Sequence, residues 1–112
     1  MAREAAADLH LDRSPQKQDV IVHDNYIGDS YGALTPSCSE AMRLVARTEG
    51  VILDPVYSGK AMAGLVGLIR KGSITRDETV VFLHTGGQPA LFAYEARELL
   101  SPSPSHSRQG AR

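Results

Sequence analysis

Residues 79–92 read TVVFLHTGGQPALF, and this stretch decides the fold class. The run 80–83 is apolar at every position instead of alternating with polar residues, which is typical of a strand covered on both faces in a parallel sheet. Two glycines then permit a tight turn, and Pro89 is favourable in the first turn of a helix. The stretch therefore predicts a strand over 79–85 that leads into a helix over 89–100.

A second unit of the same kind lies earlier in the chain, where VILD at 51–54 runs into PVYSGKAMAGL at 55–65. We predict a short buried strand over 51–54 and a helix from Ser58 to Lys71, ended by Gly72. Each glycine inside that helix costs about 0.5–1 kcal/mol relative to alanine, so the glycines predict close approach by another backbone or a ligand. The apolar stripe expected on this helix consists of Ala61, Leu65, Leu68 and Ile69.

The rest of the chain continues the alternation of helices and strands. We predict a helix over 2–9, a strand over 19–24, a loop over 25–37, and a helix from a cap at Ser37 or Ser39 to Gly50. Such alternation is typical of an α/β architecture. Residues 1–100 are therefore expected to form a partial parallel sheet with flanking helices, and the Ser/Pro-rich residues 101–112 are expected to form a disordered tail.

Composition excludes several classes of protein. The chain has 112 residues and a formal net charge of −1, which fits one domain and indicates no nucleic-acid or anionic-membrane partner. No apolar run approaches the roughly 20 residues that span a bilayer. No two histidines have the i, i+4 spacing of a helical metal site. We therefore expect a cytoplasmic protein without a metal. The single cysteine, Cys38, is either a low-pKa thiol at a helix start or a half-buried inert residue.

A ligand site is expected beyond the carboxyl ends of the strands, as in other parallel sheets. Two loops occupy that edge, DPVYSGK at 54–60 and HTGGQP at 84–89, and both run into helix N-termini that favour an anion or an acceptor atom. Tyr57, Ser58 and Thr85 would then face one crevice. Purely structural interpretations stay open at this point: helix caps at Ser58 and Thr85, a hydrophobic staple at Tyr57, and a solvent-facing Lys60.

Three blocks together resemble one enzyme family. They are IGDSYGALTP at 27–36, ARTEGVILDPVYSGKAMAGL at 46–65 and FLHTGGQPALFAY at 82–94. The chain is similar over about residues 3–95 to the C-terminal part of the family of D-cysteine desulfhydrases and 1-aminocyclopropane-1-carboxylate deaminases. The resemblance implies a fold-type II enzyme of the tryptophan-synthase β-like kind, with pyridoxal 5′-phosphate as cofactor and a homodimeric full-length protein.

The resemblance also implies roles for individual residues. Tyr57 and Tyr31 match tyrosines near the substrate and are the expected catalytic residues, although Ser30 replaces a glycine beside Tyr31. Ser58, Thr85 and Gly86 are the expected cofactor-binding residues. Deaminases carry glutamate and leucine at the positions of Ser58 and Thr85. A neutral hydroxyl can only hydrogen-bond to an unprotonated cofactor ring, which favours loss of a β-substituent from the substrate.

The activity implied by this pair is that of the desulfhydrase branch, which converts D-cysteine to pyruvate, sulfide and ammonia. Related β-substituted amino acids such as cysteate, deamination of 1-aminocyclopropane-1-carboxylate, and a non-catalytic α/β binding module are the alternatives. The family's Schiff-base lysine and phosphate loop match nothing in this sequence, and Lys60 belongs to a different motif. We therefore expect a fragment that is inactive alone and that exposes a large apolar face.

Overall fold

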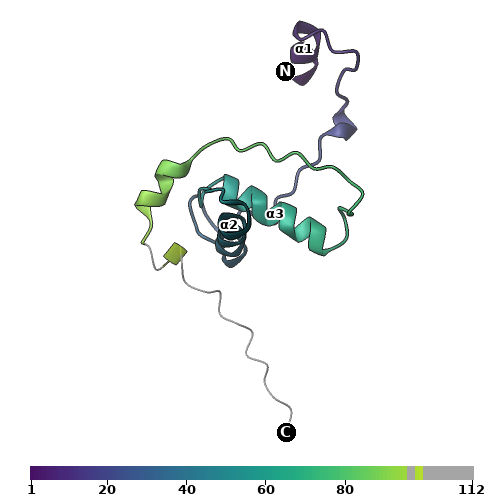
Figure 1. Cartoon of the computed structure of the whole chain (residues 1–112). Coiled ribbons are helices and arrows are strands. Elements are labelled where there is room, and N and C mark those ends of the chain that lie inside the picture. Colours follow the sequence, from purple (N-terminus) through teal and green to yellow (C-terminus); the bar gives the residue numbers. More distant parts are fainter. Residues whose placement is uncertain (96–97, 100–112) are drawn as a thin grey trace.

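The computed structural model describes residues 1–95 and 98–99, and within them the regular elements are all helical (Figure 1). In chain order these are α1 (Ala2–Asp8), the 3₁₀ helix η1 (Lys17–Asp19), α2 (Pro36–Glu49), α3 (Ser58–Arg70) and the 3₁₀ helix η2 (Gln88–Ala93). None of the helices in this part of the chain is both long and apolar enough to cross a membrane.

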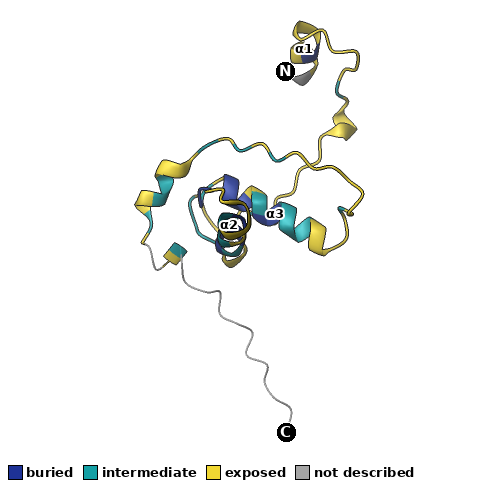
Figure 2. Cartoon of the chain, in the orientation of Figure 1, coloured by how far each residue is buried: buried dark blue, intermediate teal, exposed yellow. Residues whose placement is uncertain are grey.

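The core lies where α2 and α3 pack against each other (Figure 2). Its buried apolar side chains on these two helices are Cys38, Ala41 and Val45 of α2 and Ala63 of α3, joined by Leu53 from the segment between them. At the rim of this packing, the Arg70 guanidinium makes a two-pronged ion pair with the Glu40 carboxylate, at 2.7 and 3.2 Å. The pair of helices is the scaffold that holds the loops described below.

The predicted end of α2 is correct, but its start lies two to four residues before the predicted one, and the predicted cap is wrong. Thr35, and neither Ser37 nor Ser39, caps the helix, because its Oγ1 accepts a hydrogen bond from the Cys38 N–H at 3.1 Å. Pro36 follows at the first helical position, where a missing N–H is harmless. Gly50 ends the helix in the left-handed conformation, with φ of 67°, as predicted.

The glycines of α3 do mark close approach. A side chain at Gly59 would meet the backbone oxygen of Asp54 at 2.6 Å and the Cys38 sulfur at 2.9 Å. Gly64 and Gly67 lie against the Tyr26 ring. In the predicted apolar stripe, Ala61 and Ile69 are exposed and Leu65 and Leu68 are half-buried, because the small-residue face of α3 carries the packing.

The three predicted strands, over 19–24, 51–54 and 79–85, are not formed in the described residues. A strand is stable only when a neighbouring strand satisfies its backbone N–H and C=O groups, and here each extended segment lacks such a neighbour. Many of their apolar side chains are exposed, among them Val20, Ile21, Val22, Val81 and Leu83, although Leu53 is buried in the core. Figure 2 shows the ribbon between η1 and α2 as largely exposed where it includes residues 19–24. The predicted sheet is therefore not confirmed, and the segment before η2 runs as extended chain (Figure 1).

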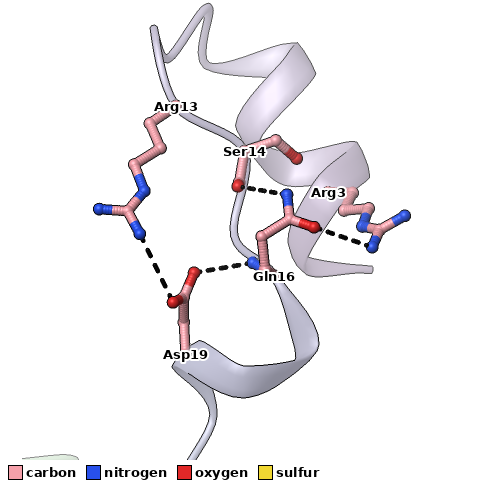
Figure 3. Close-up of polar contacts among 5 residues, drawn as sticks. All are labelled: Arg3, Arg13, Ser14, Gln16 and Asp19. Carbon is pink, nitrogen blue, oxygen red and sulfur yellow. Dashed lines mark hydrogen bonds and ion pairs between the residues drawn. The ribbon is translucent and has the colours of Figure 1, made fainter.

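The two ends of the chain follow local signals. After α1, η1 replaces the expected start of a strand at residue 19, and the Gln16 N–H donates to the Asp19 carboxylate at 2.8 Å (Figure 3). Near the other end, η2 covers residues 89–93 of the helix expected over 89–100 and ends where Tyr94 is extended, with φ of −113° and ψ of 144°, whereas Glu98 and Leu99 are helical as expected. The predicted tail over 101–112 lies outside the described residues.

Candidate functional site

The turn before α3 is built around the buried carboxylate of Asp54, which is 1% exposed. Its two oxygens accept hydrogen bonds from the N–H groups of Val56, Tyr57 and Ser58 at 2.7 to 2.8 Å. Burial by itself would raise the pKa of Asp54, but the hydrogen bonds from the Ser58 hydroxyl and from these N–H groups outweigh it and lower the pKa. The carboxylate thus satisfies N–H groups that a helix start leaves unpaired.

The hydroxyl of Ser58 is held by the same carboxylate. It donates to Asp54 Oδ1 and accepts from the Asp54 N–H at 2.9 Å, and Ser58 is only 3% exposed. Ser58 is therefore the first residue of α3 and not its cap. A hydroxyl has one proton and two lone pairs, so this arrangement leaves a single lone pair for any further partner.

The loop HTGG at 84–87 lies directly against this turn. A side chain at Gly87, whose φ is 93°, would meet the Asp54 carboxylate at 2.7 Å, so only glycine fits there. His84 Nε2 lies 2.9 Å from the Ile52 carbonyl oxygen, and the Gly86 N–H donates to His84 Nδ1 at 3.0 Å. These contacts hold the two loops side by side at the N-terminal end of α3.

A cleft of about 640 Å³ opens between α3 and the extended segments near Tyr26 and over 80–83, and we call it the main cleft. Tyr57, Ser58 and Thr85 all line it, whereas most of its other lining residues are apolar. Thr85 is exposed, and its hydroxyl makes no hydrogen bond to another described residue. Thr85 does not cap η2, whose N-terminal flanking residue is Gly87. Gly86 shapes the turn, with φ of 98°.

Tyr31 and Tyr57 form a pair although they are 26 residues apart. Their hydroxyl oxygens are 2.9 Å apart, and their rings meet edge to face with centroids at 6.0 Å. The hydrogen bond with Tyr31 is the main cause of the raised pKa of Tyr57, so Tyr57 keeps its proton at neutral pH. Tyr57 is 60% exposed, which excludes the hydrophobic staple. Tyr31 lines a second cleft of about 400 Å³. Tyr57 and Lys60 line both this second cleft and the main cleft.

Two residues that matter here were missed or misjudged from the sequence. Lys60 is 8% exposed instead of facing solvent, and its ammonium donates to the carbonyl oxygen of Ile27. Asp54 was assigned to a strand end, although aspartate is favoured in turns because its side chain accepts hydrogen bonds from backbone N–H groups a few residues later. Sequence could have suggested Asp54 by this rule, whereas Lys60 depends on a loop distant in the chain.

Cys38 is an inert core residue. It is fully buried, and its sulfur lies 3.5 Å from the Pro55 carbonyl oxygen. Burial is the main cause that raises the pKa of the Cys38 thiol to about 11, and Lys60 opposes this only in part. Within residues 1–95 and 98–99, no group of three or more histidine, cysteine, aspartate or glutamate side chains could hold a metal ion.

Comparison with known proteins identifies the family. The family model described as pyridoxal-phosphate dependent enzyme matches residues 2–86. The D-cysteine desulfhydrases of Salmonella typhi, Salmonella newport and Salmonella heidelberg are each 45% identical to this chain over 94 residues, which is 84% of the chain. The chain spans about 25% of the length of these curated relatives.

The main cleft fits the ring of pyridoxal phosphate. A planar heterocycle needs apolar walls and a polar edge, and ligand pockets commonly enclose about 300–1,000 Å³. Here the walls include Leu65, Leu68 and Val81, and the polar edge carries the Thr85 hydroxyl and the remaining lone pair of Ser58. The match over residues 2–86, more than half of the sequence, together with this fit, places the chain in the family of pyridoxal-phosphate dependent enzymes.

Proposed function

We propose that this chain forms part of the active site of a pyridoxal-phosphate dependent lyase that converts D-cysteine to pyruvate, sulfide and ammonia. The observation that carries the proposal is the shared cleft of Tyr57, Ser58 and Thr85, in which the groups at positions 58 and 85 are neutral hydroxyls. The 45% identity to D-cysteine desulfhydrases supports the choice of substrate. In the complete enzyme, the extended segments 19–24 and 79–85 would pair with further strands.

The cofactor, when bound, withdraws electrons from the Cα of the amino acid, while the protein tunes its electronics. Thr85 is the residue that we assign to the ring nitrogen, because its hydroxyl has no other described partner. Ser58 would have to leave Asp54 before its proton could reach a ring atom. In this assignment Ser58 and Gly86 shape the site, and Thr85 donates the hydrogen bond.

Tyr57 is assigned to proton transfer. A tyrosine hydroxyl carries its proton at neutral pH, and Tyr31 Oη lies close enough to Tyr57 Oη to exchange a hydrogen bond with it. Tyr57 would donate this proton to the departing sulfur of D-cysteine, and Tyr31 would hold the Tyr57 hydroxyl in place. General acid catalysis of this kind contributes roughly 10²–10⁴-fold to a rate.

The hydroxyl side chains at positions 58 and 85 disfavour the alternative of 1-aminocyclopropane-1-carboxylate deamination. Family members with that activity carry glutamate and leucine at these positions. We also propose that the 112-residue chain has no turnover alone. Lys60 is the lysine that lines the main cleft in the described residues, and the Ile27 carbonyl holds its ammonium. A cytoplasmic location and a homodimeric complete enzyme stay predictions.

The test is a chimera of the Salmonella typhi enzyme in which this chain's residues replace the matching stretch. We expect release of pyruvate and sulfide from D-cysteine, a loss of about 10²–10⁴-fold in kcat for Tyr57→Phe, and little action on 1-aminocyclopropane-1-carboxylate. A folded, cofactor-loaded chimera that prefers the cyclopropane substrate would overturn the proposal. The chain alone should release no more pyruvate than free cofactor does.

A further inference from the structure

Lys60 carries a buried charge that the proposed chemistry does not use. Its side chain is 8% exposed, and its ammonium donates to a neutral group, the Ile27 carbonyl oxygen. No described carboxylate forms an ion pair with it. Burying an ammonium group is costly unless its partners compensate, so this contact requires an explanation. What Lys60 holds is the start of the loop 27–32.

The loop 27–32 is attached to the rest of the protein at three points. Lys60 holds the Ile27 carbonyl, the Tyr57 hydroxyl holds the Tyr31 hydroxyl, and the Tyr94 hydroxyl donates to the Gly32 carbonyl. Between these anchors the backbone turns at Gly28, with φ of 79°. A side chain at that glycine would come within 2.8 Å of the Thr35 side chain, so the loop has little freedom to shift there.

Two of these anchors come from the same turn of the protein. Tyr57 immediately precedes α3, and Lys60 is its third residue, so the spacing is i, i+3 and both side chains lie on one side of the helix start. Both residues line the two clefts. The Asp54 carboxylate, which holds the Tyr57 N–H, fixes the backbone from which both side chains project.

We propose that Lys60 is a positioning residue, which ties the loop 27–32 to α3 and thereby holds the Tyr31 hydroxyl against Tyr57. A hydrogen bond from a charged donor is roughly twice as strong as a neutral one, so Lys60 is the strongest of the three anchors. The catalytic role of the pair formed by Tyr31 and Tyr57 rests on the function proposed above, whereas the positioning of Tyr31 by Lys60 does not.

The experiment compares the wild-type chain with K60M and with K17M, which alters an exposed lysine of η1. Methionine keeps the length of the side chain but has no donor. In chains with ¹³C-labelled tyrosine at pH 7, we expect an NOE between the Tyr31 and Tyr57 rings in the wild type and in K17M. In K60M the equilibrium between the held and the released loop should shift at least about tenfold toward release, as for loss of a hydrogen bond from a charged group, so the NOE should weaken. An unchanged NOE in K60M with intact helical signals would overturn the proposal.

A second measurement needs no change at Lys60 and covers the case in which K60M does not fold. The rate of Lys60 acetylation by acetic anhydride, followed by peptide mass spectrometry, should rise about fivefold in Y31F, because removal of one anchor frees the loop. Lys17 in the same sample is the internal control. Equal rates of Lys60 acetylation in wild type and Y31F would show that Lys60 and Tyr31 do not hold the same loop, and would overturn the proposal. Neither readout involves the cofactor, so failure here is separate from failure of the proposed function.

Discussion

The Ser58 hydroxyl and Asp54 are bonded to each other twice, with Ser58 donating to the carboxylate and accepting from the Asp54 N–H at 2.9 Å. This reciprocal pair closes the turn between the segment 51–54 and α3. It also decides which of the Ser58 and Thr85 hydroxyls is available to a ligand in the main cleft, because Ser58 is engaged and Thr85 has no partner among the described residues.

The first prediction is that Ser58→Ala destabilises the chain by roughly 1–3 kcal/mol, the cost of leaving a buried N–H without its acceptor. Urea unfolding followed by far-UV circular dichroism measures the change. Ser73→Ala, at an exposed position after α3, is the matched control and should lie within about 0.5 kcal/mol of wild type. Equal midpoints for both variants would contradict the role assigned to the Ser58 hydroxyl.

The second prediction concerns pH. The pKa of Asp54 is lowered in the folded chain, so its carboxylate contributes stability above its unfolded pKa of about 3.9, and this contribution is lost as pH falls through the folded value. Unfolding free energy should therefore drop on acidification below about pH 4. In Asp54→Asn this part of the pH dependence should be absent, and in the exposed control Asp77→Asn it should persist. A pH profile for Asp54→Asn that matches wild type would refute the assignment.

The third prediction separates the two hydroxyls. Thr85→Val should leave the stability within about 0.5 kcal/mol of wild type, because the hydroxyl has no described partner. In the chimera the same change should weaken cofactor affinity by about fivefold, the effect of one ordinary hydrogen bond, and Thr85→Ser should restore it. Fluorescence titration of the apo-chimera with pyridoxal phosphate measures this. Equal cofactor affinities of the Thr85→Val and Thr85→Ser chimeras would show that the Thr85 hydroxyl does not reach the cofactor.

The fourth prediction uses Cys38 as a reporter of the contact between α2 and α3. Alanine at Gly59 would overlap the Asp54 backbone oxygen and the Cys38 sulfur, and overpacking of this kind costs roughly 1–3 kcal/mol. Cys38 should consequently react faster with a thiol reagent in Gly59→Ala. Gly50→Ala, where a side chain meets nothing within 4 Å, strains only the left-handed backbone and should not expose the thiol selectively. A slow, wild-type reaction rate in Gly59→Ala would mean that the helices tolerate the extra carbon.

The sequence predicted α1, α2 and α3 to within a few residues because their signals are local. Gly50 marks the end of α2, and the run of small residues indicates the close packing of α3, whereas Pro36, the first residue of α2, was placed in the predicted loop 25–37. The strands could not be predicted in the same way, because the stability of 79–85 depends on partners outside its own sequence. The apolar run indicates burial on both faces, and these partners are not present in the described residues.

The site was only partly predictable for the same reason. Tyr57 and Ser58 lie in a recognisable block, but their contacts depend on geometry. The pairing of Tyr57 with Tyr31 and the burial of Lys60 both require the loop 27–32 to fold back on α3. The rule that lysine side chains face solvent considers each residue by itself. It fails for Lys60 because the Ile27 carbonyl, distant in the sequence, supplies a partner for the ammonium.

The central claim is that the loops 54–60 and 84–89, which meet at Asp54, receive the cofactor ring in one cleft. Pyridoxine 5′-phosphate tests it directly, since it has the ring but no aldehyde to react with lysines. In a chain with ¹³C-labelled threonine, we predict intermolecular NOEs from the ring protons to the Thr85 methyl group at millimolar ligand. NOEs confined to other threonines, or none at all with α2 and α3 folded, would contradict the account.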